Sequence, residues 1–182
     1  MDFDYIPGGL RHNETAASIT YMRRYAARRS HAPHNYLSRC LVSCKQDTRA
    51  RNVLIVDDER AVRDVLRQIF EAAGYTCRFS GDGYEALEMF KAWRPPLVVT
   101  DINHPGLSAL ELLRKVRAVD SDAALIVLTA AVDPKTVVSL LKLGADAFLR
   151  KPVIVDELLI VSERALERRQ LLSERRKRQD GA

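Results

Sequence analysis

The stretch LVVTDINHPG, from Leu97 to Gly106, contains the pattern that decides the fold. Four apolar or β-branched residues run into an aspartate, and a loop with proline and glycine follows. A short apolar run bounded by turn residues is typical of a buried β-strand. Asp101 ends this strand, where an aspartate is most often a turn or capping residue. Its role therefore depends on which other residues reach the same edge of the sheet.

The same unit recurs on both sides of this stretch, because short apolar runs alternate with amphipathic segments from Asn52 onward. We expect a buried strand at residues 53–56 and further strands at 75–79, 97–100, 125–129 and 147–149. We expect helices at residues 59–74, 83–93, 109–119 and 134–144, and from about Val155. This alternation indicates βα units and a parallel sheet covered on both faces. Right-handed crossovers then favour an α/β, five-stranded, doubly wound sheet in the flavodoxin-like order 2-1-3-4-5.

Length and composition limit the organisation of the chain. With 182 residues and 47% hydrophobic content, it has room for one ordinary domain plus extensions. We expect a basic, flexible or loosely docked arm at residues 1–50, the domain at 51–165, and a charged helical extension or tail at 166–182. The net charge of +5 favours a solvated basic surface over a nucleic-acid contact. Three sparse cysteines, no signal peptide and no membrane-length apolar run favour the cytoplasm.

Polar residues that are far apart in the sequence fall at equivalent ends of the expected strands. Asp57 and Asp58 follow the first strand, Asp101 ends the third, Thr129 ends the fourth, and Lys151 lies just beyond the fifth. The carboxyl ends of parallel strands share one edge, and the first and third strands diverge there at the switch point where ligands bind. The sequence therefore predicts one polar site at this edge.

The charges of this group indicate its chemistry. Two carboxylates about 4 Å apart repel by roughly 4 kcal/mol at an effective dielectric constant of 20, so cations have to offset three of them. Carboxylate oxygens suit Mg²⁺ better than zinc, which favours His or Cys. A metal beside a further carboxylate, a hydroxyl and an ammonium group suits phosphoryl transfer. Asp101 would then be a nucleophile that forms an acyl phosphate.

Four motifs in these positions resemble those of a known family. They are VDDE at 56–59, TDINHPG at 100–106, LTA at 128–130 and LRKP at 149–152. Residues 52 to about 165 resemble the receiver domain of two-component response regulators. The resemblance implies that Asp101 is the phosphoacceptor. It also implies that Asp58 binds Mg²⁺ directly, that Asp57 binds it largely through water, and that Asp101 and the backbone carbonyl of Asn103 complete the metal ligands.

The resemblance further implies a switch. Lys151 would pair with the acceptor or the phosphoryl group, and the Lys151–Pro152 peptide would be cis. Thr129 would rotate to hydrogen bond the phosphoryl group, and Phe148 would move inward to fill the vacated space, although spacing alone favours ordinary core packing for Phe148.

The function implied is a signalling module and not an enzyme beyond self-phosphorylation and slow autodephosphorylation. It would take a phosphoryl group from a histidine kinase or phosphotransfer protein and change its binding to a downstream protein partner. Two alternatives stay open. One is a phosphorylation-independent pseudo-receiver adapter, and the other is a metal-dependent phosphatase that uses Asp101 as its nucleophile.

The chain departs from the family pattern in the loop after Asp101. His104 stands where methionine is usual, and Ser108 and Ala109 stand where aspartate and glycine are usual. Alanine enters positive φ less readily than glycine, so we expect this loop to follow a different path and phosphorylation to be slower.

The carboxy-terminal end carries the remaining alternatives. Leu171 and Leu172 fit either a homodimer seam or, as we favour, a solvated charged helix. We do not expect direct DNA binding or a membrane contact, because neither a helix-turn-helix nor a stacking-aromatic pattern accompanies RRKR at 175–178. The short remainder after the domain predicts a stand-alone regulator or a fragment of a longer one.

Overall fold

A five-stranded parallel sheet forms the centre of the computed structural model, which describes residues 51–130 and 134–180. The strands are β1 (Asn52–Val56), β2 (Thr76–Ser80), β3 (Leu97–Asp101), β4 (Ala124–Thr129) and β5 (Ala147–Arg150). Their order is β2-β1-β3-β4-β5, and every neighbouring pair is parallel. The predicted doubly wound order is therefore confirmed, whereas the arm expected at residues 1–50 lies outside the described residues.

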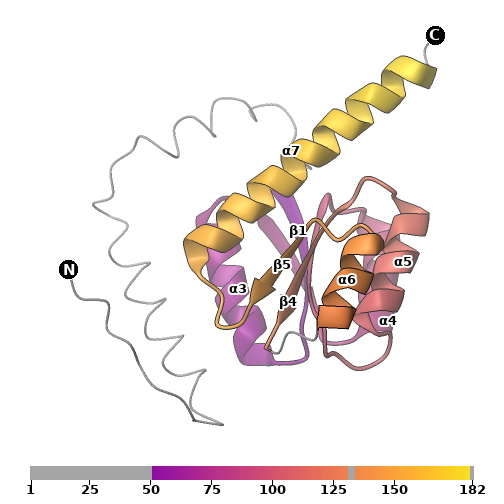
Figure 1. Ribbon diagram of the computed structural model, residues 1–182. Helices are drawn as coiled ribbons and strands as arrows, with labels where there is room; N and C mark the ends of the chain where they lie inside the picture. The colour runs from indigo at the N-terminus through magenta and orange to yellow at the C-terminus, as the bar shows by residue number, and fades with distance from the viewer. Residues whose placement is uncertain (1–50, 131–133, 181–182) are drawn as a thin grey trace. The chain divides into compact units, whose positions relative to one another are not determined.

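Five helices cover the two faces of this sheet. They are α3 (Arg60–Ala72), α4 (Gly83–Trp93), α5 (Ala109–Val119), α6 (Pro134–Lys142) and α7 (Val155–Asp180). Helices α3 and α7 lie on one face, and α4, α5 and α6 lie on the other (Figure 1). Among the described residues, no helix combines the length and the apolar character needed to cross a bilayer.

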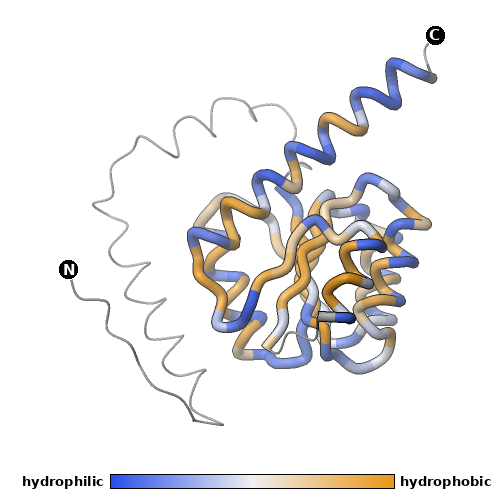
Figure 2. The backbone as a smooth tube through the Cα atoms, viewed as in Figure 1, coloured by the Kyte–Doolittle hydropathy of each residue, from blue (hydrophilic) through white to orange (hydrophobic). Residues whose placement is uncertain are grey.

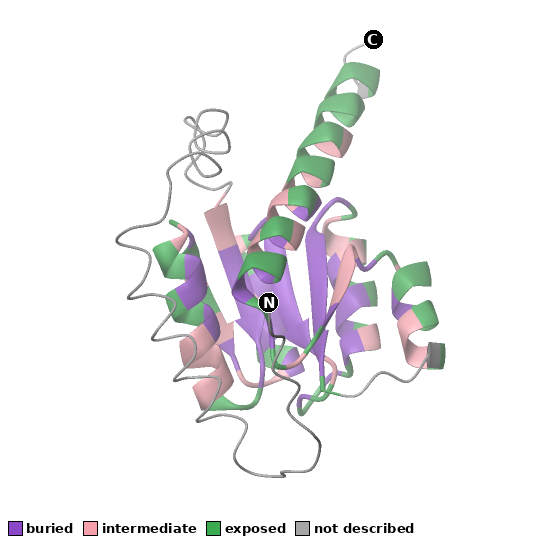
Figure 3. Cartoon of the chain, turned by 60° about the vertical axis from the view of Figure 1, so that its left-hand side comes forward, coloured by how far each residue is buried: buried purple, intermediate pink, exposed green. Residues whose placement is uncertain are grey.

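The core lies between the strands and these helices. Successive strand residues point to opposite faces, so Leu54 and Val56 of β1 pack with α4 and α5 while Val53 and Ile55 are buried on the other side. Figure 2 shows hydrophobic strands at the centre, and Figure 3 shows that the central strands are buried while the edge strands are partly exposed. Burial of both faces explains why β1, β3 and β4 are almost continuously apolar.

Side-chain caps fix where α4 and α5 begin. Asp82 accepts hydrogen bonds from the backbone of Tyr84 at 2.7 Å, and so caps α4. Ser108 and Glu111 form a capping box at the start of α5. Ala109 is the first residue of that helix, and the positive φ of the preceding loop falls at Gly106 (83°). Ala109 therefore needs no positive φ, because glycine occupies the left-handed position.

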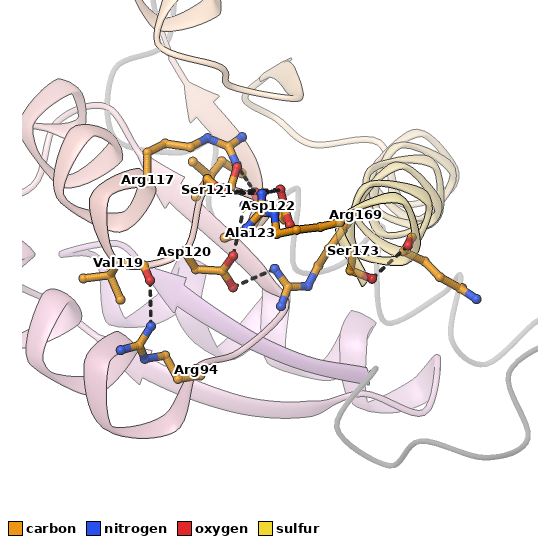
Figure 4. A network of polar contacts seen from close by, with 12 residues as sticks. Arg94, Arg117, Val119, Asp120, Ser121, Asp122, Ala123, Arg169 and Ser173 are labelled. Atoms are coloured by element: carbon orange, nitrogen blue, oxygen red, sulfur yellow. Dashed lines mark hydrogen bonds and ion pairs between the residues drawn. The ribbon is translucent and has the colours of Figure 1, made fainter. Parts of the chain in front are cut away.

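Ion pairs fasten the distal part of α7 to the ends of the strands where they begin (Figure 4). We call these pairs the helix latch: Arg168–Asp146, Arg169–Asp120 at 2.7 Å and Arg176–Asp122 at 2.8 Å. Arg117 of α5 supports the latch by donating to the backbone carbonyls of Ser121 at 2.7 Å and Ala123 at 2.6 Å. The predicted extension is thus a continuation of α7 whose inner face is held by acids of the domain.

Candidate functional site

The β1–β3 pairing positions the two buried carboxylates. Val56 of β1 lies beside Thr100 of β3, and the next residues are Asp57 and Asp101. Both side chains are therefore presented at the carboxyl edge of adjacent strands, as the sequence predicted from the switch-point rule. Lys151 follows β5, two strands away from β3.

Lys151 bridges these carboxylates. Its Nζ lies 2.7 Å from Oδ2 of Asp57 and 3.2 Å from Oδ1 of Asp101. The exposed fractions of the side chains are 16% for Lys151, 0% for Asp57 and 8% for Asp101. Three groups separated by up to 94 positions in the sequence thus meet in one nearly buried cluster.

Backbone amides hold the second oxygen of each carboxylate. The amide of Glu59 donates to Oδ1 of Asp57 at 2.9 Å, and the amide of Asn103 donates to Oδ2 of Asp101 at 3.1 Å. Each carboxylate therefore has one oxygen directed to Lys151 and the other to its own following loop. This arrangement fixes both orientations before any ligand binds.

Burial dominates the electrostatics of the cluster. It raises the pKa of Asp57, and the hydrogen bond and charge of Lys151 only partly offset this rise. Burial also opposes the charge on Lys151, but hydrogen bonding to Asp57 and the attraction of Asp57 and Asp101 outweigh it, so the pKa of Lys151 is raised. The ammonium group is thus firmly charged, while the ionised Asp57 would gain from a further cation.

The other predicted site residues lie around this cluster. Asp58 is exposed, and its carboxylate has no hydrogen-bond or ion-pair partner within the described ranges. Thr129 is buried at the end of β4, and its carbonyl accepts a hydrogen bond from the Lys151 amide at 2.8 Å. Phe148 is half-buried on β5 and packs against the hydrophobic core. The cis Lys151–Pro152 peptide is confirmed.

The donor atoms at this edge suit a hard cation better than a soft one. Asp57 and Asp101 share one ammonium group, and Asp58 offers a further carboxylate at the rim. Among residues 51–130 and 134–180, no three His, Cys, Asp or Glu side chains form a ready-made metal cluster. Mg²⁺ requires no such closed cage, because it keeps several waters and uses one or two carboxylates. The oxygen-only donor set is therefore compatible with Mg²⁺.

His104 packs the acceptor loop against the start of α4. Its side chain is buried, with 9% exposure, and Nδ1 lies 3.2 Å from the carbonyl of Pro105. A Cβ atom on Gly83 would lie 2.8 Å from Cε1 of His104 and 2.6 Å from the carbonyl oxygen of Leu107. The loop and the helix thus approach each other closely only because position 83 is glycine.

Arg63 is a residue of this region that the sequence reasoning missed. It lies in α3 and donates from Nη1 to the carbonyls of Asp57 at 2.5 Å and Asp58 at 2.9 Å. A cation near the start of a helix opposes the helix dipole. Arg60, the first residue of α3, opposes the dipole in the same way, so the sequence holds no signal that singles out Arg63.

Comparison with known proteins agrees with this geometry. The family described as the response regulator receiver domain matches residues 53–162. The response regulator MprA of Mycobacterium ulcerans (strain Agy99) is 43% identical over 122 residues, which cover 67% of this chain and 52% of that protein. MprA of Mycobacterium tuberculosis (strain H37Rv) is 42% identical over 117 residues, covering 64% and 50%. The chain thus spans about half the length of the curated relatives that it matches.

Solved structures show the same fold. A CheY-like receiver domain protein from Methanospirillum hungatei JF-1 has a TM-score of 0.64 and 30% identity, covering 66% of this chain and 96% of that one. A receiver domain protein from Clostridium thermocellum has a TM-score of 0.64 and 29% identity, covering 66% and 98%. Together with the matched residues 53–162 and the clustered aspartates, these findings show that the chain belongs to the receiver domain family of response regulators, which serve two-component signalling.

Proposed function

We propose that Asp101 accepts a phosphoryl group from a phosphohistidine of a histidine kinase or phosphotransfer protein. The observation that carries this proposal is the bridge from Lys151 to both Asp57 and Asp101, at 2.7 and 3.2 Å. A structural ion pair would need only one of the carboxylates. A cation shared by two buried carboxylates at a switch point is instead typical of a site that binds and transfers charge.

The transfer follows from the positions of these groups. An oxygen of the Asp101 carboxylate attacks phosphorus while the bond between phosphorus and the donor's imidazole nitrogen breaks. The products are an acyl phosphate on Asp101 and an imidazole that recovers its proton at that nitrogen. Lys151 stabilises the negative charge on the transferred oxygens, and the Asn103 amide keeps the attacking carboxylate in place.

The metal ligands in this proposal are the side chains of Asp57, Asp58 and Asp101 and the backbone carbonyl of Asn103. Mg²⁺ bound there would neutralise the phosphoryl oxygens as charge develops. The burial that raises the pKa of Asp57 supports this assignment, because a second cation would relieve the cost of its ionised form. Asp58 supports it as well, since its exposed carboxylate is not committed to another described residue.

Thr129 and Phe148 form the proposed switch. Thr129 ends β4 next to the strand that carries Asp101, and this position supports the proposal that its hydroxyl turns toward the phosphoryl group. Phe148 lies on β5 beside Val127 and is only half-buried, so an inward rotation would bury more of its ring. The motion would change the surface of α6, β5 and α7, which is where we expect a downstream protein partner to bind.

The protein would lie in the cytoplasm and take up a single phosphoryl group per chain without enzymatic turnover. A homodimer through α7 is the alternative to a solvated α7. Leu171, with 58% exposure, is an apolar residue that favours self-association of α7, but charged residues surround it.

Labelling by a small acyl phosphate tests the proposal. We expect the full chain to take up one phosphoryl group in the presence of Mg²⁺ and none in EDTA, with a label that is acid-stable and base-labile. Asp101→Asn should abolish labelling. Asp64→Asn is the matched control, because Asp64 is a half-exposed aspartate of α3 that pairs only with neighbouring arginines.

Labelling of Asp101→Asn at the wild-type level would exclude this acceptor. Release of many phosphates per chain from a generic phosphoester would favour a phosphatase. Partner binding that ignores both phosphodonor and Mg²⁺ would indicate an adapter.

A further inference from the structure

One arginine binds the backbone that carries both acidic residues of the β1–α3 turn. Nη1 of Arg63 donates to the carbonyl of Asp57 at 2.5 Å and to the carbonyl of Asp58 at 2.9 Å. Two successive carbonyls are therefore directed to a single nitrogen. Such a contact fixes the two peptide planes that flank Asp58, and hence the direction in which its side chain leaves the backbone.

The contact adds positive charge without using a carboxylate oxygen. The two side-chain oxygens of Asp57 accept hydrogen bonds from Lys151 and from the Glu59 amide. The carboxylate of Asp58 has no hydrogen-bond or ion-pair partner among the described residues. An arginine that paired with either carboxylate would instead compete with a metal ion. Arg63 instead contacts the turn through its backbone and leaves both carboxylates to other partners.

A second loop encloses the guanidinium group. A Cβ atom on Gly81, in the β2–α4 loop, would lie 3.2 Å from Nη1 of Arg63 and 3.8 Å from the carbonyl of Asp57. Arg63 therefore occupies a narrow space between the β2–α4 loop and the acidic turn. Glycine at position 81 leaves that space open, and a methyl group there would press on the same nitrogen that binds the two carbonyls.

Of the three arginines of α3, Arg63 is the one that contacts the carbonyls of the preceding turn. The two other arginines of α3 behave as ordinary surface residues. Arg60 and Arg67 both face Asp64, at 3.9 and 3.7 Å, on the exposed side of the helix.

We infer that Arg63 is a positioning residue for the divalent-cation site: it holds the Asp57–Asp58 backbone so that both carboxylates face the ion that Asp101 needs. This inference rests on the proposed function, because it assumes that the acidic edge binds Mg²⁺. It adds a residue outside the ligand set and a reason for the glycine at position 81.

Mg²⁺ binding to the full chain tests the inference without measuring phosphorylation. The dissociation constant is obtained by isothermal titration calorimetry, and the rise in melting temperature on adding MgCl₂ is recorded in parallel. We expect Arg63→Met to weaken Mg²⁺ binding roughly tenfold, as is usual when a residue that orients metal ligands is lost. Arg63→Lys should recover part of the affinity, and Gly81→Ala should weaken binding although the arginine is present.

A control variant and the possible contrary results separate the role of Arg63 from the phosphoacceptor proposal. Arg67→Met removes a cation from the same helix and should leave the dissociation constant unchanged. Equal Mg²⁺ affinity in wild type and Arg63→Met would overturn the role of Arg63 and leave the phosphoacceptor proposal intact. No Mg²⁺ binding by the wild type at millimolar concentration would overturn both. If Arg63→Met does not fold, an unchanged affinity in both Arg63→Lys and Gly81→Ala would overturn the inference.

Discussion

His104 carries the one buried side-chain nitrogen that has no hydrogen-bond partner within the described residues. That atom is Nε2, while Nδ1 lies near the carbonyl of Pro105. A buried polar atom without a partner costs roughly 1–3 kcal/mol, because it loses water and gains nothing in return. The acceptor loop therefore has a local defect three residues after Asp101.

Replacing His104 by methionine should relieve this defect. The two side chains have similar volumes, and methionine adapts well to irregular spaces. We expect His104→Met to raise the free energy of unfolding by about 1 kcal/mol. Urea denaturation followed by circular dichroism measures the change. A less stable variant would mean that Nε2 has a partner, such as a bound water, that compensates for its burial.

Replacing Gly83 by alanine should change the free energy of unfolding in the opposite direction. Alanine is normally favoured over glycine inside a helix by about 1 kcal/mol. Here its Cβ would meet the carbonyl oxygen of Leu107 at 2.6 Å and His104 at 2.8 Å, so overpacking, which typically costs about 1–3 kcal/mol, should outweigh the gain. We expect Gly83→Ala to lower the free energy of unfolding in the same urea assay. A stabilised variant would show that the acceptor loop moves away from α4 easily.

At the scale of elements, the helix latch explains how a largely polar stretch of helix stays on the domain. The distal half of α7 is hydrophilic (Figure 2), so apolar burial contributes little there. The attachment comes instead from Arg169 on Asp120 and Arg176 on Asp122, where the aspartate side chains are only 18% and 9% exposed. Low exposure of the acids makes these pairs stronger than ordinary surface ion pairs.

Breaking the latch should release the end of α7 and leave the domain folded. We expect Arg169→Gln to lower the free energy of unfolding by no more than about 1 kcal/mol and to speed amide hydrogen exchange in residues 166–180. Arg175→Gln is the control, since Arg175 is exposed and has no ion-pair partner among residues 51–130 and 134–180. Equal exchange in the two variants would show that α7 holds its place without Asp120.

The latch should also respond to acid. Burial opposes the charge of Asp120, but the hydrogen bond from Arg169, the Asp122 amide and nearby arginines outweigh it, so its pKa lies below the ordinary 3.8. A carboxyl group whose pKa is lowered by folding stabilises the folded state above its unfolded pKa and loses this effect as the pH falls through its folded pKa. The difference in unfolding free energy between wild type and Asp120→Asn should therefore be constant above about pH 5 and shrink below pH 3.8. A difference that persists unchanged at pH 2 would contradict this.

The sequence predicted the elements closely but not the latch. Helix and strand bounds follow from local periodicity and caps, so α4 and α5 begin and end at the expected residues. The latch joins residues 49 and 54 positions apart, and it depends on the direction in which α7 runs over the sheet. A charged tail with several arginines does not indicate which of them meets an acid.

At the scale of the whole molecule, the described elements form one parallel sheet with helices on both faces. All five strands and their covering helices lie between Asn52 and Asp180. The described chain begins at Arg51, which donates to the carbonyl of Ala73 at 2.8 Å and lies 5.4 Å from the centre of the Tyr75 ring. Arg51 therefore ties the start of β1 to the connection between α3 and β2.

A chain of residues 51–182 should unfold cooperatively at nearly the temperature of the full chain. In the variant Arg51→Gln, loss of the hydrogen bond and of the ring contact should lower the free energy of unfolding by about 1 kcal/mol. Differential scanning calorimetry of the three proteins measures both effects. A non-cooperative transition in residues 51–182 would show that the preceding segment is required for folding.

The site was predictable to the extent that it depends on topology. Asp57, Asp101 and Lys151 meet because parallel strands bring their carboxyl ends to one edge, and the strand order follows from the βα alternation. Arg63 and His104 were not predictable in this way. Their positions depend on the path of short loops, where a change of one dihedral angle redirects a side chain.

Arg51 and the helix latch lie where the strands begin, whereas Asp101 lies where they end. These described contacts thus lie at the edge of the sheet opposite the acceptor. The acceptor edge itself consists of the short loops that follow the strands. A conformational change that passes from Asp101 to the opposite edge of the sheet has to cross the length of a five-residue strand, roughly 17 Å.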